Sequence, residues 1–331
     1  MRKLLMSAVA VTVLMATQGF ATEGKFSGIA FGDAYWFAGN HDSAVEKSNG
    51  TWMRRVYLTY DVKHSDEVSM RFRLETGSPG VTAGGGKMEP FAKDAYLKWK
   101  KGGKSIYFGL SGSPSFAGIE EAWGYRHVEK TPADLYKMAS TRDFGIGVKG
   151  NLSDQLDYHL MVGNGNATAA ENNKGKKYMA SVGYGLTDGI SIRGNFDFDD
   201  QKGEATFTTA QVHLSSKGDG LRWGLHFLAN TTDDGNNSES TNVASVYGVK
   251  SLSETSSVLA RVDLVLDELQ VAGGGGYLPM AAGSKLNFIL LGYDWTASDG
   301  LHLIPNVEIV MYDADGLDTD LVPRITAAFQ W

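Results

Sequence analysis

The last eleven residues of the chain alternate strictly between two kinds of side chain. One set is Leu321, Pro323, Ile325, Ala327, Phe329 and Trp331, and the other is Val322, Arg324, Thr326, Ala328 and Gln330. Because side chains of a β-strand point to opposite sides in turn, this pattern predicts a strand with one apolar and one mixed face. About ten such residues suffice to cross a membrane as one strand of a barrel. An edge strand of a soluble β-sandwich would also show this pattern, so the rest of the chain must decide.

Similar alternating segments recur along the chain, and short and long gaps separate them in turn. Short gaps with turn residues lie at 64–67, 101–103, 151–155, 186–189, 215–220, 251–255 and 295–300. Long polar gaps lie at 39–50, 77–90, 111–141, 164–176, 199–204, 230–241, 267–283 and 313–320. Short turns at one end and long loops at the other are typical of outer-membrane barrels, and the gaps delimit about sixteen strands.

Residues 1–21 have the features of a secretory signal peptide. Arg2 and Lys3 precede an apolar run over 4–15, and Gly19, Phe20 and Ala21 form a cleavage site of the expected kind. We therefore expect an exported mature chain that begins at Thr22 and forms one domain over 22–331. The chain has no cysteine, which excludes disulfide scaffolds, thiol catalysis and cysteine metal sites.

No stretch beyond the signal peptide approaches the roughly 18 consecutive apolar residues of a membrane helix. A membrane role then requires a closed barrel, since no other structure satisfies its backbone polar groups in lipid. The sequence thus predicts an all-β, 16-stranded antiparallel transmembrane β-barrel in the outer membrane of a Gram-negative cell, in contact with lipid and lipopolysaccharide. A barrel of about 16 strands leaves an aqueous channel. The net charge is −7, so a basic nucleic-acid surface is not expected.

The gap at 111–141 is the longest, and it is too apolar for a disordered surface loop. Its apolar residues include Pro114, Phe116, Ile119, Trp123, Tyr125, Leu135, Tyr136 and Met138. We expect this third long loop to fold into the pore and to carry Glu120, Glu121, Arg126 and Lys130 to a constriction. An outward loop that plugs the barrel or contacts another subunit is the alternative.

The opposing side of the constriction is predicted from strand parity. Arg55, Arg71 and Arg73 share the lumen face of neighbouring strands and form the densest basic cluster. Facing the loop carboxylates, they would create a transverse field that selects ions by sign. Further lumen-lining candidates are Lys98, Arg193, Arg261 and Arg324, with many acidic residues among them.

Other motifs give weaker indications. Asp313, Asp315 and Asp318 form an acidic stretch that could bind Ca²⁺ or Mg²⁺, although a solvated loop fits the spacing better. Glycine runs at 84–86 and 273–276 are interpreted as flexible loops. The seven histidines are scattered without metal-ligand spacing, so we expect no cofactor and no enzyme, although sequence alone does not exclude a Ser-His site on the barrel exterior.

Several short blocks resemble the phosphate-selective porin O and P family. They are 54–58 (RRVYL), 94–98 (DAYLK), 107–109 (YFG) with Pro114 and Phe116, Glu120-Glu121, and 142–146 (RDFGI). The resemblance, best over about residues 50–160, implies a trimeric 16-stranded porin with its third loop in the channel. It also implies that Phe329 and Trp331 form the terminal signal read by the barrel-assembly machinery. Phosphate-selective members line the pore with arginines, whereas here acidic residues are interleaved.

The predicted function is passive diffusion of ions and small hydrophilic solutes, with the resemblance adding a preference for anions or phosphate. The alternative is a closed or plugged barrel that acts as an adhesin or structural anchor. A hydrolase on the membrane surface is a third candidate, which would need a serine and a histidine within hydrogen-bond reach.

Overall fold

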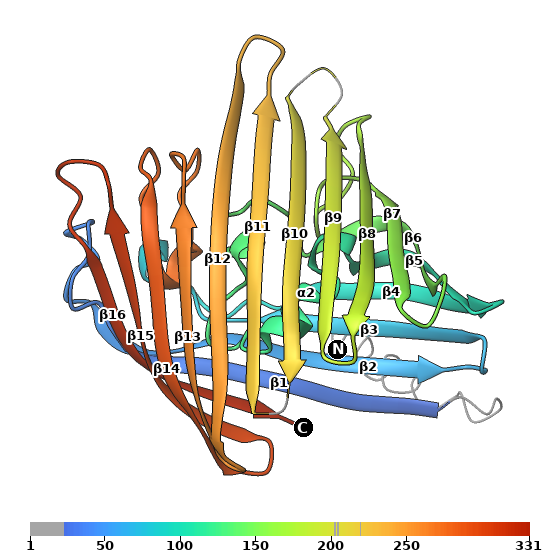
Figure 1. Ribbon diagram of the computed structural model, residues 1–331, viewed down its shortest axis with the longest axis horizontal. Helices are drawn as coiled ribbons and strands as arrows, with labels where there is room; N and C mark the ends of the chain where they lie inside the picture. Colours follow the sequence, from blue (N-terminus) through green and yellow to red (C-terminus); the bar gives the residue numbers. More distant parts are fainter. Residues whose placement is uncertain (1–22, 202, 204, 219) are drawn as a thin grey trace, which may run out of the picture.

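The computed structural model describes residues 23–331 apart from 202, 204 and 219, and the predicted signal peptide lies outside this range. Sixteen antiparallel strands form a closed barrel in which each strand pairs with its sequence neighbours and β1 pairs with β16 (Figure 1). The strands are β1 (Glu23–Trp36), β2 (Asn49–Lys63), β3 (Val68–Thr76), β4 (Phe91–Lys101), β5 (Lys104–Gly112), β6 (Arg142–Asn151), β7 (Leu156–Gly163), β8 (Lys176–Thr187), β9 (Ile190–Asp200), β10 (Thr206–Gly218), β11 (Leu221–Asp233), β12 (Ser238–Ser253), β13 (Ser256–Val265), β14 (Leu286–Ser298), β15 (Leu301–Tyr312) and β16 (Asp320–Gln330). The predicted fold class is confirmed.

The helical segments are short and lie in loops. They are η1 (Val81–Ala83), η2 (Pro114–Phe116), α2 (Ile119–Trp123), α3 (Pro132–Leu135) and η3 (Gly275–Tyr277). In the part of the chain that the structure describes, no helix is long and apolar enough to cross a membrane.

Short turns alternate with longer loops, as predicted, with one of the long gaps misjudged. The polar stretch at 230–241 is mostly strand, because β11 continues to Asp233 and β12 already begins at Ser238. Polar side chains do not end a strand whose backbone can still pair, and Thr231 lies opposite Ser240 in this extension. The hairpin therefore projects beyond its neighbours at the top of Figure 1.

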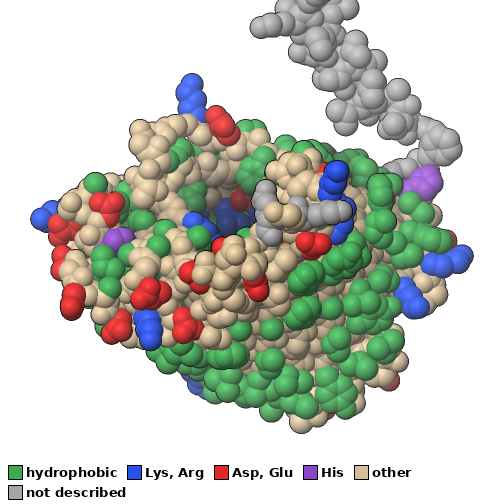
Figure 2. All heavy atoms as spheres, turned by 90° about the horizontal axis from the view of Figure 1, so that it is seen from above, with side chains coloured by type: hydrophobic (Ala, Val, Ile, Leu, Met, Phe, Trp, Pro, Cys, Tyr) green, Lys and Arg blue, Asp and Glu red, His purple; other side chains and the backbone are tan. Residues whose placement is uncertain are grey.

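The outer and inner faces of the barrel follow the predicted alternation. On β2 and β3, Leu58 and Phe72 are 45% and 41% exposed on the outer face, whereas the inward Thr59 is 2% exposed. Apolar side chains cover much of the outer wall in Figure 2. Such a surface is stable in contact with lipid and would be unfavourable in water over so large an area.

The barrel closes where the chain end meets β1. The backbone amide of Trp331 donates to the carbonyl of Gly28, and the amide of Gly28 donates back to the carbonyl of Trp331, both at 3.1 Å. The Phe329 and Trp331 rings stack with centroids 5.7 Å apart, and both side chains are exposed on the outside. A β-carbon added to Gly28 would lie 2.1 Å from the Trp331 indole, so this close approach requires glycine.

Replacing Gly28 by Ala should displace the Trp331 indole and weaken the closing strand pair. We expect the free energy of unfolding to fall by about 1 kcal/mol, measured by urea titration of the barrel in lipid vesicles. Gly248→Ala is the matched control, because Gly248 also lies on a strand and a β-carbon there meets no atom within 4 Å. Equal losses in the two variants would contradict this role of Gly28.

Candidate pore constriction

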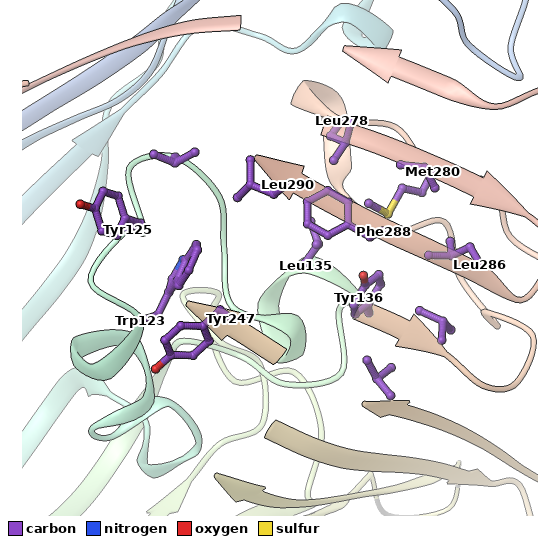
Figure 3. Close-up of a cluster of buried hydrophobic side chains, with 14 of the residues drawn as sticks. Trp123, Tyr125, Leu135, Tyr136, Tyr247, Leu278, Met280, Leu286, Phe288 and Leu290 are labelled. Atoms are coloured by element: carbon purple, nitrogen blue, oxygen red, sulfur yellow. The ribbon is translucent and has the colours of Figure 1, made fainter. Parts of the chain in front are cut away.

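The loop over residues 113–141, called here the inward loop, lies inside the barrel and packs on its wall. Trp123, Leu135 and Tyr136 are at most 2% exposed. Their neighbours in the apolar cluster include Tyr247 and Phe288 from β12 and β14 (Figure 3). Burial of these side chains supplies the favourable free energy that holds the loop inward.

Polar side chains of the wall also bind the backbone of the inward loop. Asn195 and Gln211 donate to the carbonyl of Ser115 at 2.8 and 3.0 Å, and Thr209 donates to the carbonyl of Met138 at 2.7 Å. These bonds satisfy loop carbonyls that the barrel would otherwise bury without partners. With the apolar cluster, they place the loop along the side of the barrel formed by β8 to β14.

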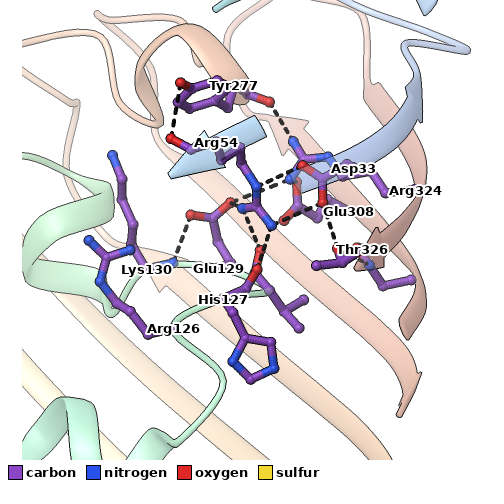
Figure 4. Close-up of polar contacts among 12 residues, drawn as sticks. Asp33, Arg54, Arg126, His127, Glu129, Lys130, Tyr277, Glu308, Arg324 and Thr326 are labelled. Atoms are coloured by element: carbon purple, nitrogen blue, oxygen red, sulfur yellow. Dashed lines mark hydrogen bonds and ion pairs between the residues drawn. The ribbon is translucent and has the colours of Figure 1, made fainter. Parts of the chain in front are cut away.

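The tip of the inward loop is held by a buried network of charged side chains (Figure 4). Arg54 donates to the carbonyls of His127 and Val128 at 2.6 and 2.7 Å and pairs with Asp33 at 2.6 Å. Glu129 lies 3.6 Å from Arg324, which pairs with Glu308 at 2.7 Å. Burial alone would raise the pKa of Glu129, but Arg54 and Arg324 lower it, so the carboxylate stays charged.

Arg54 was not predicted as an inward residue, because parity puts it on the lipid face. A β-bulge at Phe31/Gly32 leaves Arg54 without a ladder partner and turns it inward beside Arg55. A second bulge at Arg73/Leu74 does the same for Lys93, whose ammonium lies 3.0 Å from Glu75. Each bulge could have been predicted from two adjacent charged residues in one strand. In a regular strand such neighbours point to opposite faces, so one of the two charges would lie in lipid.

The three predicted arginines lie on one side of the lumen, together with Lys98, which was predicted to line the lumen, and with three further basic residues. We call the seven the basic wall; they come from β2, β3, β4 and β6 and are Arg55, Arg71, Arg73, Lys93, Lys98, Arg142 and Lys149. Three carboxylates, Asp61, Glu75 and Asp94, lie among them, so the wall has a net charge of four positive units. The inward loop packs mainly on β8 to β14, and beside it the Arg55, Lys93 and Arg142 side chains of the wall keep 13%, 12% and 17% of their surface exposed.

Ion pairs distribute the charge of the basic wall unevenly. Arg71 binds Asp61 through two bonds of 2.7 and 2.8 Å. Arg73 lies 3.2 Å from Asp94, Arg142 also binds Asp94, and Arg55 lies 3.5 Å from Glu75. Among the described residues, Lys98 and Lys149 form no ion pair, and their ammonium groups lie 5.6 and 5.0 Å from the centroid of the Tyr107 ring.

The inward loop presents Glu120, Arg126 and Asp134 toward the basic wall. Arg126 lies between the two carboxylates, 2.9 Å from Glu120 and 2.7 Å from Asp134. Burial would raise the pKa of Asp134, yet Arg126, Lys130, Arg55 and Lys93 together lower it. Asp134 is therefore ionised and within the field of the wall.

Two predicted constriction residues on the loop are placed differently. Glu121 points away from the basic wall and pairs with Lys217 of β10 at 2.6 Å. Lys130 is partly buried, and burial lowers the pKa of its ammonium although Asp134 and Glu129 oppose that shift. The carbonyl of Lys130 accepts a hydrogen bond from Arg261.

The prediction that Arg261 and Arg324 line the lumen is wrong. Both point inward, but the inward loop covers them, and they are 1% and 3% exposed. Arg261 pairs with Asp263 and lies between the Trp123 and Phe288 rings, 5.6 and 5.4 Å from their centroids. Arg193 remains partly exposed and pairs with Asp157 at 2.7 Å, and Lys98 belongs to the basic wall.

The weak cation site predicted at Asp313, Asp315 and Asp318 is not assembled. All three side chains are exposed, and within the described residues no three acidic or histidine side chains are placed to hold a metal ion. The buried carboxylate of this segment is Asp320, which binds the Tyr312 hydroxyl at 2.6 Å and the His41 ring at 2.9 Å. It fixes the loop after β1 to the start of β16.

A second loop, residues 266–285, also folds inward, contrary to the interpretation of 273–276 as a flexible loop. Leu278 and Met280 are at most 1% exposed, and the amide of Gly274 donates to the carbonyl of Leu135 at 2.8 Å. Tyr277 donates to the carbonyl of Ser78, which joins this loop to the one after β3. The apolar residues at 277–280 could have predicted this, because an apolar composition was the reason for expecting the loop at 111–141 to fold inward.

Neither a protein-family model nor a curated protein matches the sequence. Solved structures, in contrast, are similar over nearly the whole chain. The anion-selective porin from Comamonas acidovorans is 11% identical with a TM-score of 0.69, covering 94% of this chain and 100% of that chain. The outer membrane channel DcaP of Acinetobacter baumannii is 13% identical with a TM-score of 0.66, covering 95% and 99%. OmpT, an outer membrane protein of Vibrio cholerae in a trimer form, is 11% identical with a TM-score of 0.65, covering 94% and 100%.

The fold is that of the outer-membrane porins. At these identities the similarity concerns the fold, so it supports the porin part of the resemblance without singling out the phosphate-selective porin O and P family. Together with the apolar outer wall, it describes a porin-type barrel with a loop folded into its lumen.

Proposed function

We propose that this chain is a passive outer-membrane porin that conducts ions and small hydrophilic solutes and prefers anions. The observation that carries the proposal is the basic wall, in which Lys98 and Lys149 have no ion-pair partner among the described residues. Figure 2 looks into the hollow of the barrel and shows Lys and Arg side chains within it. A wall with four net positive charges raises the local concentration of anions in a confined aqueous path.

General anion preference fits the basic wall better than phosphate selectivity does. Each of the three predicted arginines has a carboxylate within 3.5 Å, so the arginine charges are largely compensated. Lys98 and Lys149 supply compact ammonium charges instead of the planar fork of arginine. The similar porin from Comamonas acidovorans is described as anion-selective, which supports the same reading.

The reversal potential of the wild-type protein tests both parts of the proposal. The purified barrel in a planar bilayer with a tenfold KCl gradient should show stable conductance. Its reversal potential should be shifted from zero toward the equilibrium potential of chloride. Because K⁺ and Cl⁻ have similar mobilities in water, a clear offset reports the field of the pore. Conductance no higher than that of bare lipid would exclude the channel, and an offset toward potassium would exclude anion preference.

A plugged barrel that serves as an adhesin or anchor is the second candidate. The second inward loop favours it, because its contacts with Leu135 and Ser78 add to the material inside the barrel. This candidate requires that the purified protein does not conduct, so the same bilayer experiment separates the two.

We propose further that the mature barrel is embedded beside lipopolysaccharide as a homotrimer. The trimer form of the similar Vibrio cholerae OmpT supports the oligomeric state. The exposed Phe329 and Trp331 at the end of β16 are proposed as the signal for the barrel-assembly machinery, after export through the signal peptide. Cross-linking of the folded protein in outer-membrane preparations would test the trimer.

A further inference from the structure

A cavity of about 470 Å³ lies beneath the tip of the inward loop. Residues 124–127 of the loop form one side, and the inner faces of β1, β2, β11 and β14 to β16 form the other. Gly300 and Gln330 also line it; they lie at the β14–β15 turn and at the end of β16. The cavity is therefore on the side of the loop that faces the short turns, and its volume suits a small organic molecule.

The charged groups of this cavity favour an anion. Arg222 forms no ion pair among the described residues, and its closest polar contact is the carbonyl of Trp123 at 3.3 Å. The carboxylate in the cavity, Asp294, already accepts from the Tyr125 hydroxyl at 2.9 Å and contacts the His302 ring at 2.8 Å. Arg222 therefore has no carboxylate partner, and Asp294 is already bound to other side chains. A bound anion could form the charge-assisted hydrogen bonds that Arg222 lacks.

His127 also lines this cavity, and one of its ring nitrogens has no hydrogen-bond partner among the described residues. Its Nε2 is buried and has no hydrogen-bond partner in the described part of the chain. Burial lowers the pKa of His127 to about 4, with help from His302 and Arg54 and against the opposing effect of Asp294. The ring is thus neutral at pH 7, and a ring nitrogen can bond to a hydroxyl group.

Aromatic side chains also line the cavity. Phe31, Tyr57 and Tyr125 contribute to its lining, and Phe31 and Tyr125 are 3% and 7% exposed. Such rings favour a planar aromatic guest through offset or edge-to-face contacts. A small aliphatic or inorganic anion would leave this surface without contacts.

We propose that this cavity is a binding site for small aromatic monocarboxylates that carry a ring hydroxyl. The carboxylate binds Arg222, the ring lies against the aromatic lining, and the hydroxyl bonds to a ring nitrogen of His127. The proposal rests on the proposed function in one respect, since the solute reaches the cavity through the porin lumen. Bound there, it would obstruct the path below the constriction.

Calorimetric titration of the detergent-folded barrel with 4-hydroxybenzoate tests the site without any need for conduction. We expect saturable binding, with cyclohexanecarboxylate, 4-hydroxybenzyl alcohol and inorganic phosphate each binding at least tenfold more weakly. Arg222→Gln should weaken 4-hydroxybenzoate about tenfold, as loss of a charge-assisted bond would. Lys250→Gln is the matched control: it removes an exposed positive charge at the same end of the neighbouring strand β12, outside the cavity, and should bind as wild type.

A second variant keeps the proposal testable if Arg222→Gln fails to fold. His127→Phe keeps an aromatic ring but has no ring nitrogen, and it should abolish the preference for 4-hydroxybenzoate over benzoate. Equal binding of phosphate or cyclohexanecarboxylate, or an unchanged affinity in folded Arg222→Gln, would overturn the proposal. Absence of conductance with intact binding would instead contradict only the proposed porin function.

Discussion

Replacing Arg324 by Gln is expected to lower the free energy of unfolding by about 3–5 kcal/mol. Arg324 belongs to the buried network that holds the loop tip, which has three carboxylates, Asp33, Glu129 and Glu308, and only two guanidinium groups. Losing this guanidinium removes the ion-pair partner of Glu308 and one of the partners of Glu129 in a water-poor site. We expect the loop tip to detach first, seen as a lower urea midpoint and faster amide exchange over 125–130.

Glu308→Gln is the control for this prediction, because it removes a charge from the same ion pair with the opposite sign. The network then has two carboxylates for two guanidinium groups, so we expect stability to change by no more than about 1 kcal/mol. Similar large losses in both variants would show that the pair is held by shape and hydrogen bonds rather than by charge balance.

The barrel architecture was predictable because two physical constraints act on every strand. Lipid on one side and water on the other impose period-two alternation, and short hairpins need turn residues such as Gly102 and Gly103, whose φ angles are +55° and +74°. These signals are local in sequence, so the strand number and most boundaries follow from them. Where polarity alone was used, at 230–241, the boundaries were wrong.

The candidate constriction was predicted only in part, since its details depend on contacts between distant segments. Parity found Arg55, Arg71 and Arg73, but bulges added Arg54 and Lys93, which adjacent charges in the sequence could have revealed. Which wall the inward loop covers depends on how its apolar residues match those of β12 to β14. No pattern within the loop specifies that match.

Reversing the charge of Lys98 and Lys149 together is expected to turn anion preference into cation preference. The double substitution Lys98→Glu with Lys149→Glu takes the basic wall from four net positive charges to none. The loop side then dominates, with Glu120 and Asp134 against the single charge of Arg126. Neither lysine has an ion-pair partner among the described residues, so no carboxylate loses its partner and folding should be little affected.

The measurement is the reversal potential in a KCl gradient near 0.1 M, where the Debye length of about 10 Å lets wall charges act across a narrow path. The offset should change sign in the double variant and shrink for every protein near 1 M salt. Lys101→Glu with Lys104→Glu is the matched control, because these lysines face each other at the β4–β5 turn and undergo the same charge change outside the wall. If the control reverses selectivity as strongly, the field arises at the mouth of the barrel and not along the basic wall.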